Sequence, residues 1–137
     1  MKPERQHFVE WLQPLLVGLT TQTLLLEPDQ DWTPPCWRLW TLAEDGVAPG
    51  HWSLMLQLDY YRSDGDTVAA LQDCDALLKS MGFAQNMEAI VSVPRSDGSG
   101  KMSLTLSSGS WRPGPVVTVS PLDRHYVLTL ELGFPRR

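Results

Sequence analysis

The chain has 137 residues, a formal net charge of -5, 42% apolar residues and 20% charged residues. This length and balance match one globular domain with its own core, and they exclude a disordered chain. The eleven Lys and Arg residues are scattered rather than gathered into a stripe, which argues against tight binding of phosphates. Since no apolar run approaches the ~20 residues of a membrane span, and the N-terminus has no apolar signal-peptide core, we expect no membrane partner.

The first part of the chain begins with a predicted helix. Residues 2–19 carry apolar side chains at steps of three and four residues, which is the helical period. Pro14 lacks an N–H and clashes with the preceding turn, so we expect either a kink or two short helices. A short apolar run at 24–26 follows, then a predicted strand over 37–42 and a predicted turn or loop over 44–50, EDGVAPG.

The strongest pattern in the sequence is a strand–helix unit from Trp52 to Gly82. Residues 52–61 alternate strictly between apolar and more polar side chains, which predicts a strand with one buried face. Asp64 and Asp66 come next and suit the N-terminus of a helix over 66–81, closed by the glycine. The expected apolar stripe of this helix consists of Val68, Leu71, Cys74, Leu78 and Met81, with Ala70 and Leu77 beside it.

The last part of the chain predicts three more strands. Residues 89–93 and 102–106 flank the glycine-rich loop RSDGSGK at 95–101, which predicts a hairpin with a mobile loop. A proline-rich break at 111–115 precedes a final alternating strand at 124–134. The order of helix, strands, helix and strands predicts a single α+β domain, residues 1–137. We expect a mostly antiparallel sheet with its helices packed on one face.

The sequence offers no recognisable catalytic or cofactor-binding motif. His7, His51 and His125 have no His or Cys at ligand spacing, so we expect no metal ion. Cys36 and Cys74 are interpreted as reduced, buried residues. We therefore predict a protein that is not an enzyme and holds no cofactor.

Carboxylate pairs and tryptophans also have structural interpretations. The pairs at 64/66, 73/75 and 29/31 are assigned to helix capping, to the solvent face of a helix and to a loop. Four tryptophans gather within about twenty residues, which favours either core packing or a protein interface. These four are Trp32, Trp37, Trp40 and Trp52.

Taken in order, these segments resemble the tail terminator or tail completion proteins of long-tailed bacteriophages. The resemblance rests on a helix ending in leucines, the segment HWSLMLQLDYYRSDGDTVAALQDCDALLKSMGF, a hairpin and the terminal RHYVLTLELGF. Its most specific stretch is Leu56 to Leu78, and Pro14 and the segment 111–115 depart from the family pattern.

The resemblance implies a hexameric ring that caps the last ring of the tail tube and stops its polymerisation. The implied partners are further copies of the chain, the tail tube protein and a head–tail connector or neck protein. DNA would pass through an acidic ring without specific binding, because like charges repel. The implied location is the tail or neck of the virion, and the host cytoplasm during assembly.

Ring contacts are expected from sheet edges and hairpins. The first candidate contacts end the best strand and are either interface residues or the edge of the core: Tyr60, Tyr61 and Arg62. The second set lies in the glycine-rich loop, which either orders on assembly or is an ordinary exposed tip: Arg95, Asp97 and Lys101.

Other functions remain open on sequence alone. One is a different neck or head–tail joining protein, and another is a monomeric protein-binding module or assembly chaperone that uses the region from Trp32 to Trp52. A third is a small enzyme with dispersed residues, which would need a deep polar cleft containing a histidine.

Overall fold

The computed structural model describes residues 3–19, 23–26, 34–48, 50–83, 90–107, 111–115 and 120–135. These residues form two helices and a seven-stranded sheet. In chain order the elements are α1 (Glu4–Leu16), β1 (Leu24–Leu26), β2 (Cys36–Ala48), β3 (His51–Arg62), α2 (Thr67–Met81), β4 (Val91–Pro94), β5 (Lys101–Leu106), β6 (Arg112–Pro113) and β7 (Arg124–Pro135).

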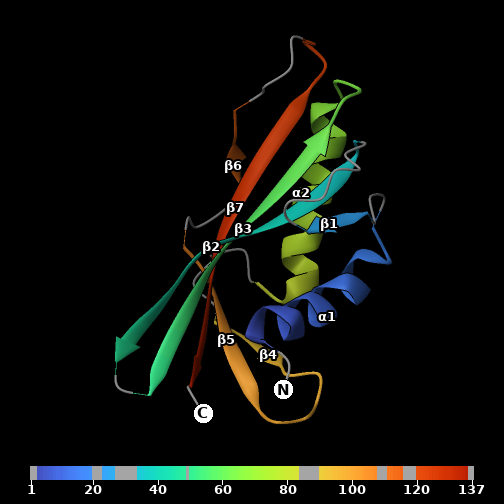
Figure 1. Ribbon diagram of the computed structural model, residues 1–137. Coiled ribbons are helices and arrows are strands. Elements are labelled where there is room, and N and C mark those ends of the chain that lie inside the picture. Colours follow the sequence, from blue (N-terminus) through green and yellow to red (C-terminus); the bar gives the residue numbers. More distant parts are fainter. Residues whose placement is uncertain are drawn as a thin grey trace.

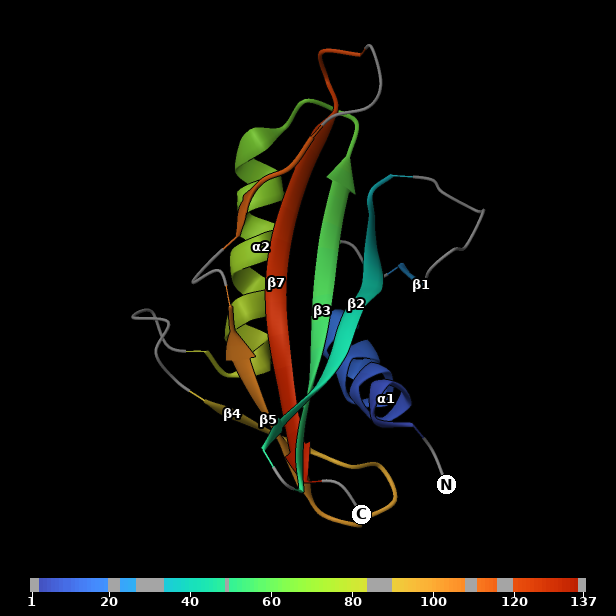
Figure 2. The same ribbon diagram turned by 60° about the vertical axis from the view of Figure 1, so that its left-hand side comes forward.

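The sheet has the strand order β1-β2-β3-β7-β5-β4, and β6 pairs with β7 beside this path. Every pairing is antiparallel except that of β1 with β2. Both helices lie on the same side of the sheet (Figures 1 and 2). The prediction of an α+β fold with a mostly antiparallel sheet is therefore confirmed.

The core lies between the sheet and the helices, and the alternation of β3 and β7 builds it. Leu54, Leu56 and Leu58 of β3 are buried on the helix side, in register with buried leucines of β7. Phe8 of α1 and Leu77 of α2 belong to the same cluster. Both strands fall where the period-two pattern predicts them, because each has one face that must be buried.

The ends of α2 match the prediction, and its buried face matches it in part. Asp66 accepts a hydrogen bond from the backbone N–H of Ala69 at 2.9 Å, and Gly82 ends the helix at φ 102°. Val68 and Leu71, assigned to the apolar stripe, are 66% and 48% exposed. Cys74, Leu78 and Met81 of the predicted stripe are buried, as are the residues beside it, Ala70 and Leu77, and Asp73 is buried with them.

This shift arises because a carboxylate occupies a core position. Asp73 is buried and accepts a 2.6 Å hydrogen bond from the Tyr60 hydroxyl, so it does not face solvent as predicted. A polar residue on the inner face removes one position from the apolar pattern. The hydrophobic pattern therefore includes Val68 and Leu71, which are exposed, and leaves out Asp73, which is buried.

Three other local predictions need correction. The first helix is a single element to Leu16, with Pro14 in its last turn, so the prediction of two short helices is wrong. The predicted turn at 44–50 is largely strand, because β2 runs to Ala48 through bulges after Thr41 and Gly46. The apolar run 24–26 forms β1, an element not assigned from sequence.

The predicted hairpin of 89–93 with 102–106 is confirmed as β4 and β5, although residue 89 lies outside the described part of the chain. The glycine-rich loop that joins them contacts α1. Arg95 is 4% exposed, and its Nη2 lies 3.5 Å from Glu4 Oε1. The backbone N–H of Ser96 donates to His7 Nδ1 at 3.1 Å.

The tryptophans divide between the core and the surface. Trp37 is fully buried, with its ring 4.5 Å from that of Tyr60 and 5.7 Å from that of Trp111. Trp40 and Trp52 are half-buried, and residue 32 lies outside the described residues. The core interpretation therefore holds for Trp37, while Trp40 and Trp52 keep part of their surface open.

Candidate functional site

The face of the sheet turned away from the helices carries an open hollow of about 540 Å³. Trp40 of β2, Asp59 and Tyr61 of β3, and His125 of β7 line it, together with the segment from Arg112 to Pro115. Outward positions of three neighbouring strands meet here because the register places Tyr61 opposite His125. The proline-rich segment forms the remaining wall through the pairing of β6 with β7.

His125 and Asp59 form an ion pair at the base of this hollow. His125 Nε2 lies 2.9 Å from Asp59 Oδ1, and His125 Nδ1 lies 2.6 Å from the carbonyl oxygen of Pro115. A carbonyl and a carboxylate accept hydrogen bonds, so the imidazolium form, with a proton on each ring nitrogen, is the form that satisfies both contacts. The ring also stacks on Tyr61, with centroids 4.4 Å apart and planes 14° from parallel.

The pKa of His125 follows from these contacts. Burial acts to lower the pKa, but the hydrogen bond to Asp59, the Pro115 carbonyl and the Asp59 charge outweigh it. The pKa of His125 therefore lies above its ordinary value of 6.5. The same surroundings raise the pKa of Tyr61 to about 12, first through burial and then through the nearby charge of Asp59.

Asp59 is the centre of the polar contacts on this face. Its side chain is 1% exposed and accepts hydrogen bonds from Gln57 Nε2 at 3.0 and 3.3 Å as well as from His125. A buried carboxylate with several donors is satisfied rather than reactive. Both nitrogens of His125 are occupied as well, so neither residue is free to take a proton from a substrate.

Gly114 allows the proline-rich segment to approach His125 closely. Its N–H donates to the backbone oxygen of His125 at 2.9 Å. A Cβ at this position would lie 2.6 Å from His125 Nδ1 and 2.7 Å from Val127 Cγ2, so only glycine fits. The segment predicted as a simple break is thus a strap, residues 111–115, which is pinned to the sheet through β6 and His125.

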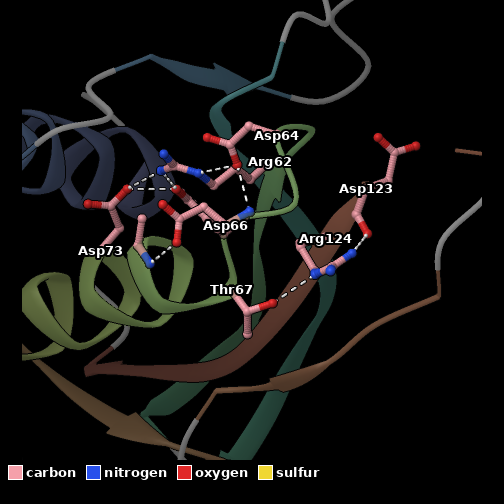
Figure 3. Close-up of polar contacts among 9 residues, drawn as sticks. Arg62, Asp64, Asp66, Thr67, Asp73, Asp123 and Arg124 are labelled. Carbon is pink, nitrogen blue, oxygen red and sulfur yellow. Dashed lines mark hydrogen bonds and ion pairs between the residues drawn. The ribbon is translucent and has the colours of Figure 1, made fainter. Parts of the chain in front are cut away.

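A second polar cluster lies where β3 ends beside the N-terminus of α2 (Figure 3). Arg62 donates to Asp64 at 2.8 Å, to the Tyr60 hydroxyl at 3.1 Å and to Asp73 at 3.4 Å. The Arg62 hydrogen bond, helped by the Asp66 N–H, lowers the pKa of Asp64 to about 2. Across the helix N-terminus, Arg124 Nε donates to the Thr67 hydroxyl at 2.9 Å.

The contacts of this cluster show where the three candidate interface residues at the end of β3 lie. Tyr60 is fully buried, so in this structure it presents no surface to a partner. Arg62 is 13% exposed and ties β3 to α2. Tyr61 faces the opposite side and lines the hollow. The three residues therefore do not form one patch.

The three candidate interface residues of the glycine-rich loop also differ in exposure. Arg95 lies buried against α1, whereas Asp97 and Lys101 are exposed. Asp97 Oδ1 accepts the backbone N–H of Ser99 at 2.9 Å, which shapes the loop. The structure places this loop against α1 and does not bring it to the hollow.

The hollow itself was missed from sequence. Asp59 and His125 are 66 residues apart, and no local motif joins them. The one available signal was their place on the outward faces of two strongly predicted strands. The strap could not be predicted because the residues Trp111, Pro113 and Pro115 indicate only a break between strands.

Within the described residues, no group of three or more His, Cys, Asp or Glu side chains is arranged to hold a metal ion. No helix in that part of the chain is long and apolar enough to cross a membrane. Cys36 and Cys74 are free and buried, as predicted, and burial raises the pKa of the Cys74 thiol.

No protein-family model and no curated protein sequence matches the chain.

Proposed function

We propose that this protein is a virion assembly protein that caps the tail tube of a long-tailed bacteriophage. In this proposal a ring of six copies ends polymerisation of the tube and forms the surface that meets the head connector or neck. The sequence resemblance supports it through the strand–helix unit from Trp52 to Gly82. That unit folds as a central strand and a helix, with Asp66 in the predicted capping position.

The observation that carries the proposal is the difference between the two ends of the sheet. At one end the β2–β3 hairpin extends beyond the helices (Figures 1 and 2). Towards the other end, residues of the strap and of β7 line the hollow on the outer face. A closed ring needs two different surfaces on each copy, since each copy contacts the next head to tail. The β2–β3 hairpin and the outer-face hollow are two such surfaces.

The edges of the sheet are less suited to this role than the sequence suggested. The path of strands ends at β1, which has three residues, and at β4, which has four and ends in Pro94. Short edges and proline are typical of strands protected from further pairing. We therefore expect ring contacts to use the outer face and the hairpin rather than edge pairing.

The charge of the chain is compatible with a ring around DNA. At a net charge of -5 per copy, a ring of six repels a phosphate backbone, so DNA passes without being held. A basic lining would instead bind DNA and slow its passage.

Sedimentation velocity and electron microscopy, with and without purified tail tubes, test the proposal. The expected result is a concentration-dependent hexamer, or rings seeded at one end of each tube, and tubes that stop growing. A strict monomer in the presence of tubes would count decisively against it.

A second candidate, a monomeric protein-binding module, is favoured by one observation. Trp40 is half-buried beside the hollow, and Leu42 on the same strand is 53% exposed. Half-exposed aromatic and aliphatic residues next to a hollow are typical of a contact surface. In that case Trp40→Ala would abolish partner capture by a monomer without lowering its melting temperature.

A further inference from the structure

The hollow on the outer face carries an exposed cation, Arg112, although the chain is acidic. Arg112 is exposed at its rim, and within the described residues its Nη2 meets Thr129 Oγ1 at 3.5 Å, the limit of a hydrogen bond. The imidazolium of His125 lies at its base, and the Arg38 guanidinium stands 5.5 Å over the Trp40 ring. The carboxylate of Asp59 is already bonded to Gln57 and His125. The group that best complements this hollow is therefore a carboxylate.

A carboxylate of suitable position lies on the chain itself, in the β2–β3 hairpin. Glu44 is exposed and pairs across the hairpin with Leu54. The hairpin lies at the end of the sheet away from β6 (Figures 1 and 2). Leu42 beside it is also exposed, which gives the hairpin an apolar contact next to its charge. An exposed acidic and apolar hairpin that projects from the body is well shaped to enter a neighbour.

Glu44 and Arg112 cannot meet within one copy. Leu54 and Asp59 are separated by five steps along β3, roughly 16 Å at about 3.3 Å per residue. Arg112 also lies three strands across the sheet from β2, roughly 14 Å at about 4.8 Å per strand. Glu44 shares the helix side of the sheet with Leu54, whereas Arg112 shares the outer side with Val127. Two sites of opposite charge at opposite ends and on opposite sides of the sheet fit a head-to-tail contact between copies.

We propose that the β2–β3 hairpin of one copy docks in the outer-face hollow of the next, where Glu44 forms an ion pair with Arg112. This inference rests on the proposed function, because it describes the contact that closes the ring. The occupant is a second copy of this chain, and its recognition is by charge and by the exposed Leu42. Each copy gives one hairpin and receives one, so the contact repeats around the ring.

Charge reversal tests the pairing. Glu44→Lys and Arg112→Glu should each weaken association by about tenfold or more, measured by sedimentation velocity across a concentration series. The double variant E44K/R112E should recover most of the wild-type association, because it restores opposite charges. High salt should weaken the wild-type contact, since the pair lies at a rim that water reaches.

The matched controls are Asp75→Lys and Lys79→Glu, which change the same charges in an exposed pair on α2. They should leave association unchanged, and the melting temperature of every variant should confirm that it is folded. If both single variants still form rings, the hairpin contact is overturned while the ring function stands. Single variants that dissociate without rescue in the double variant would also overturn the pairing.

Two further outcomes separate this inference from the proposed function. A wild-type protein that never associates, even on tail tubes, would overturn the ring itself. Capture of tail tubes that depends on Arg112 but not on Glu44 would place a segment of the tube protein in the hollow and contradict docking by a second copy.

Discussion

Replacing Asp59 with asparagine tests the buried ion pair that holds the strap to the sheet. Asparagine keeps the shape of the side chain and removes its charge at a position only 1% exposed. The carboxylate accepts from His125 Nε2 at 2.9 Å and from Gln57 Nε2 at 3.0 and 3.3 Å. Removing one partner of a buried ion pair costs about 3–5 kcal/mol.

We expect Asp59→Asn to lower the free energy of unfolding by about 3 kcal/mol, the lower end of this range. Asparagine Oδ1 still accepts one hydrogen bond, which offsets part of the loss. For a chain of this size, each kcal/mol shifts the melting temperature by about 4 °C, so the expected drop is about 12 °C. Urea denaturation followed by tryptophan fluorescence measures the free energy directly.

The pH dependence gives the sharper result. The pKa of His125 is raised in the folded protein, so its contribution to stability is complete below its ordinary value of 6.5. That contribution is lost as pH rises through the raised folded pKa. The stability gap between wild type and Asp59→Asn should therefore be widest below pH 6.5 and narrow as the pH rises through the raised pKa of His125.

The matched control is Asp75→Asn, which removes an exposed carboxylate of α2 and should change stability by less than about 0.5 kcal/mol. His125→Gln should show the same narrowing gap as Asp59→Asn. A loss below about 1 kcal/mol, or a gap that does not change with pH, would refute the assignment of an imidazolium–carboxylate pair.

Three further changes probe other contacts. Tyr60→Phe removes the 2.6 Å hydrogen bond to Asp73 and should cost about 2 kcal/mol in chemical denaturation, whereas an unchanged midpoint would show that the bond adds nothing. Gly114→Ala places a Cβ 2.6 Å from His125 Nδ1 and should cost about 1–3 kcal/mol in a thermal melt; a variant as stable as wild type would mean the strap is loose. Asp66→Ala removes the N-cap acceptor of α2, so it should cost about 1 kcal/mol and speed hydrogen exchange in the first helical turn. Unchanged exchange in that turn would show that the cap is unimportant.

The central strands could be predicted from sequence because their environment is simple. In β3 and β7 one face meets the core and the other does not, so burial follows the period of the backbone. The ends of α2 were equally clear, since Asp66 and Gly82 act through local backbone contacts. Predictions of this kind depend on residues that are close in the chain.

The candidate site depends instead on residues far apart in the chain. Asp59 looks like an outward polar position until β7 brings His125 beside it, and Gly114 looks like a turn residue until the strap packs on that ring. Asp73 was assigned to the solvent face of α2 for the same reason, because Tyr60 supplies the partner that allows this carboxylate inside. Long-range polar pairing reverses the usual link between charge and exposure.

These contacts also change what the candidate interface residues mean. Tyr60 and Arg62 stabilise the junction of β3 with α2, and Arg95 holds its loop on α1. Tyr61 remains on an accessible face, where it supports His125 at the hollow. The surfaces left for assembly are the outer sheet face and the β2–β3 hairpin, and both belong to the longest strands of the fold.

The state of the wild-type protein on tail tubes tests the central claim most directly. Electron microscopy of growing tubes, combined with sedimentation of the protein alone, measures both ring formation and the end of polymerisation. The account predicts closed rings of six copies at one tube end and tubes that grow no further. A protein that stays monomeric at every concentration and leaves tube growth unchanged would contradict it.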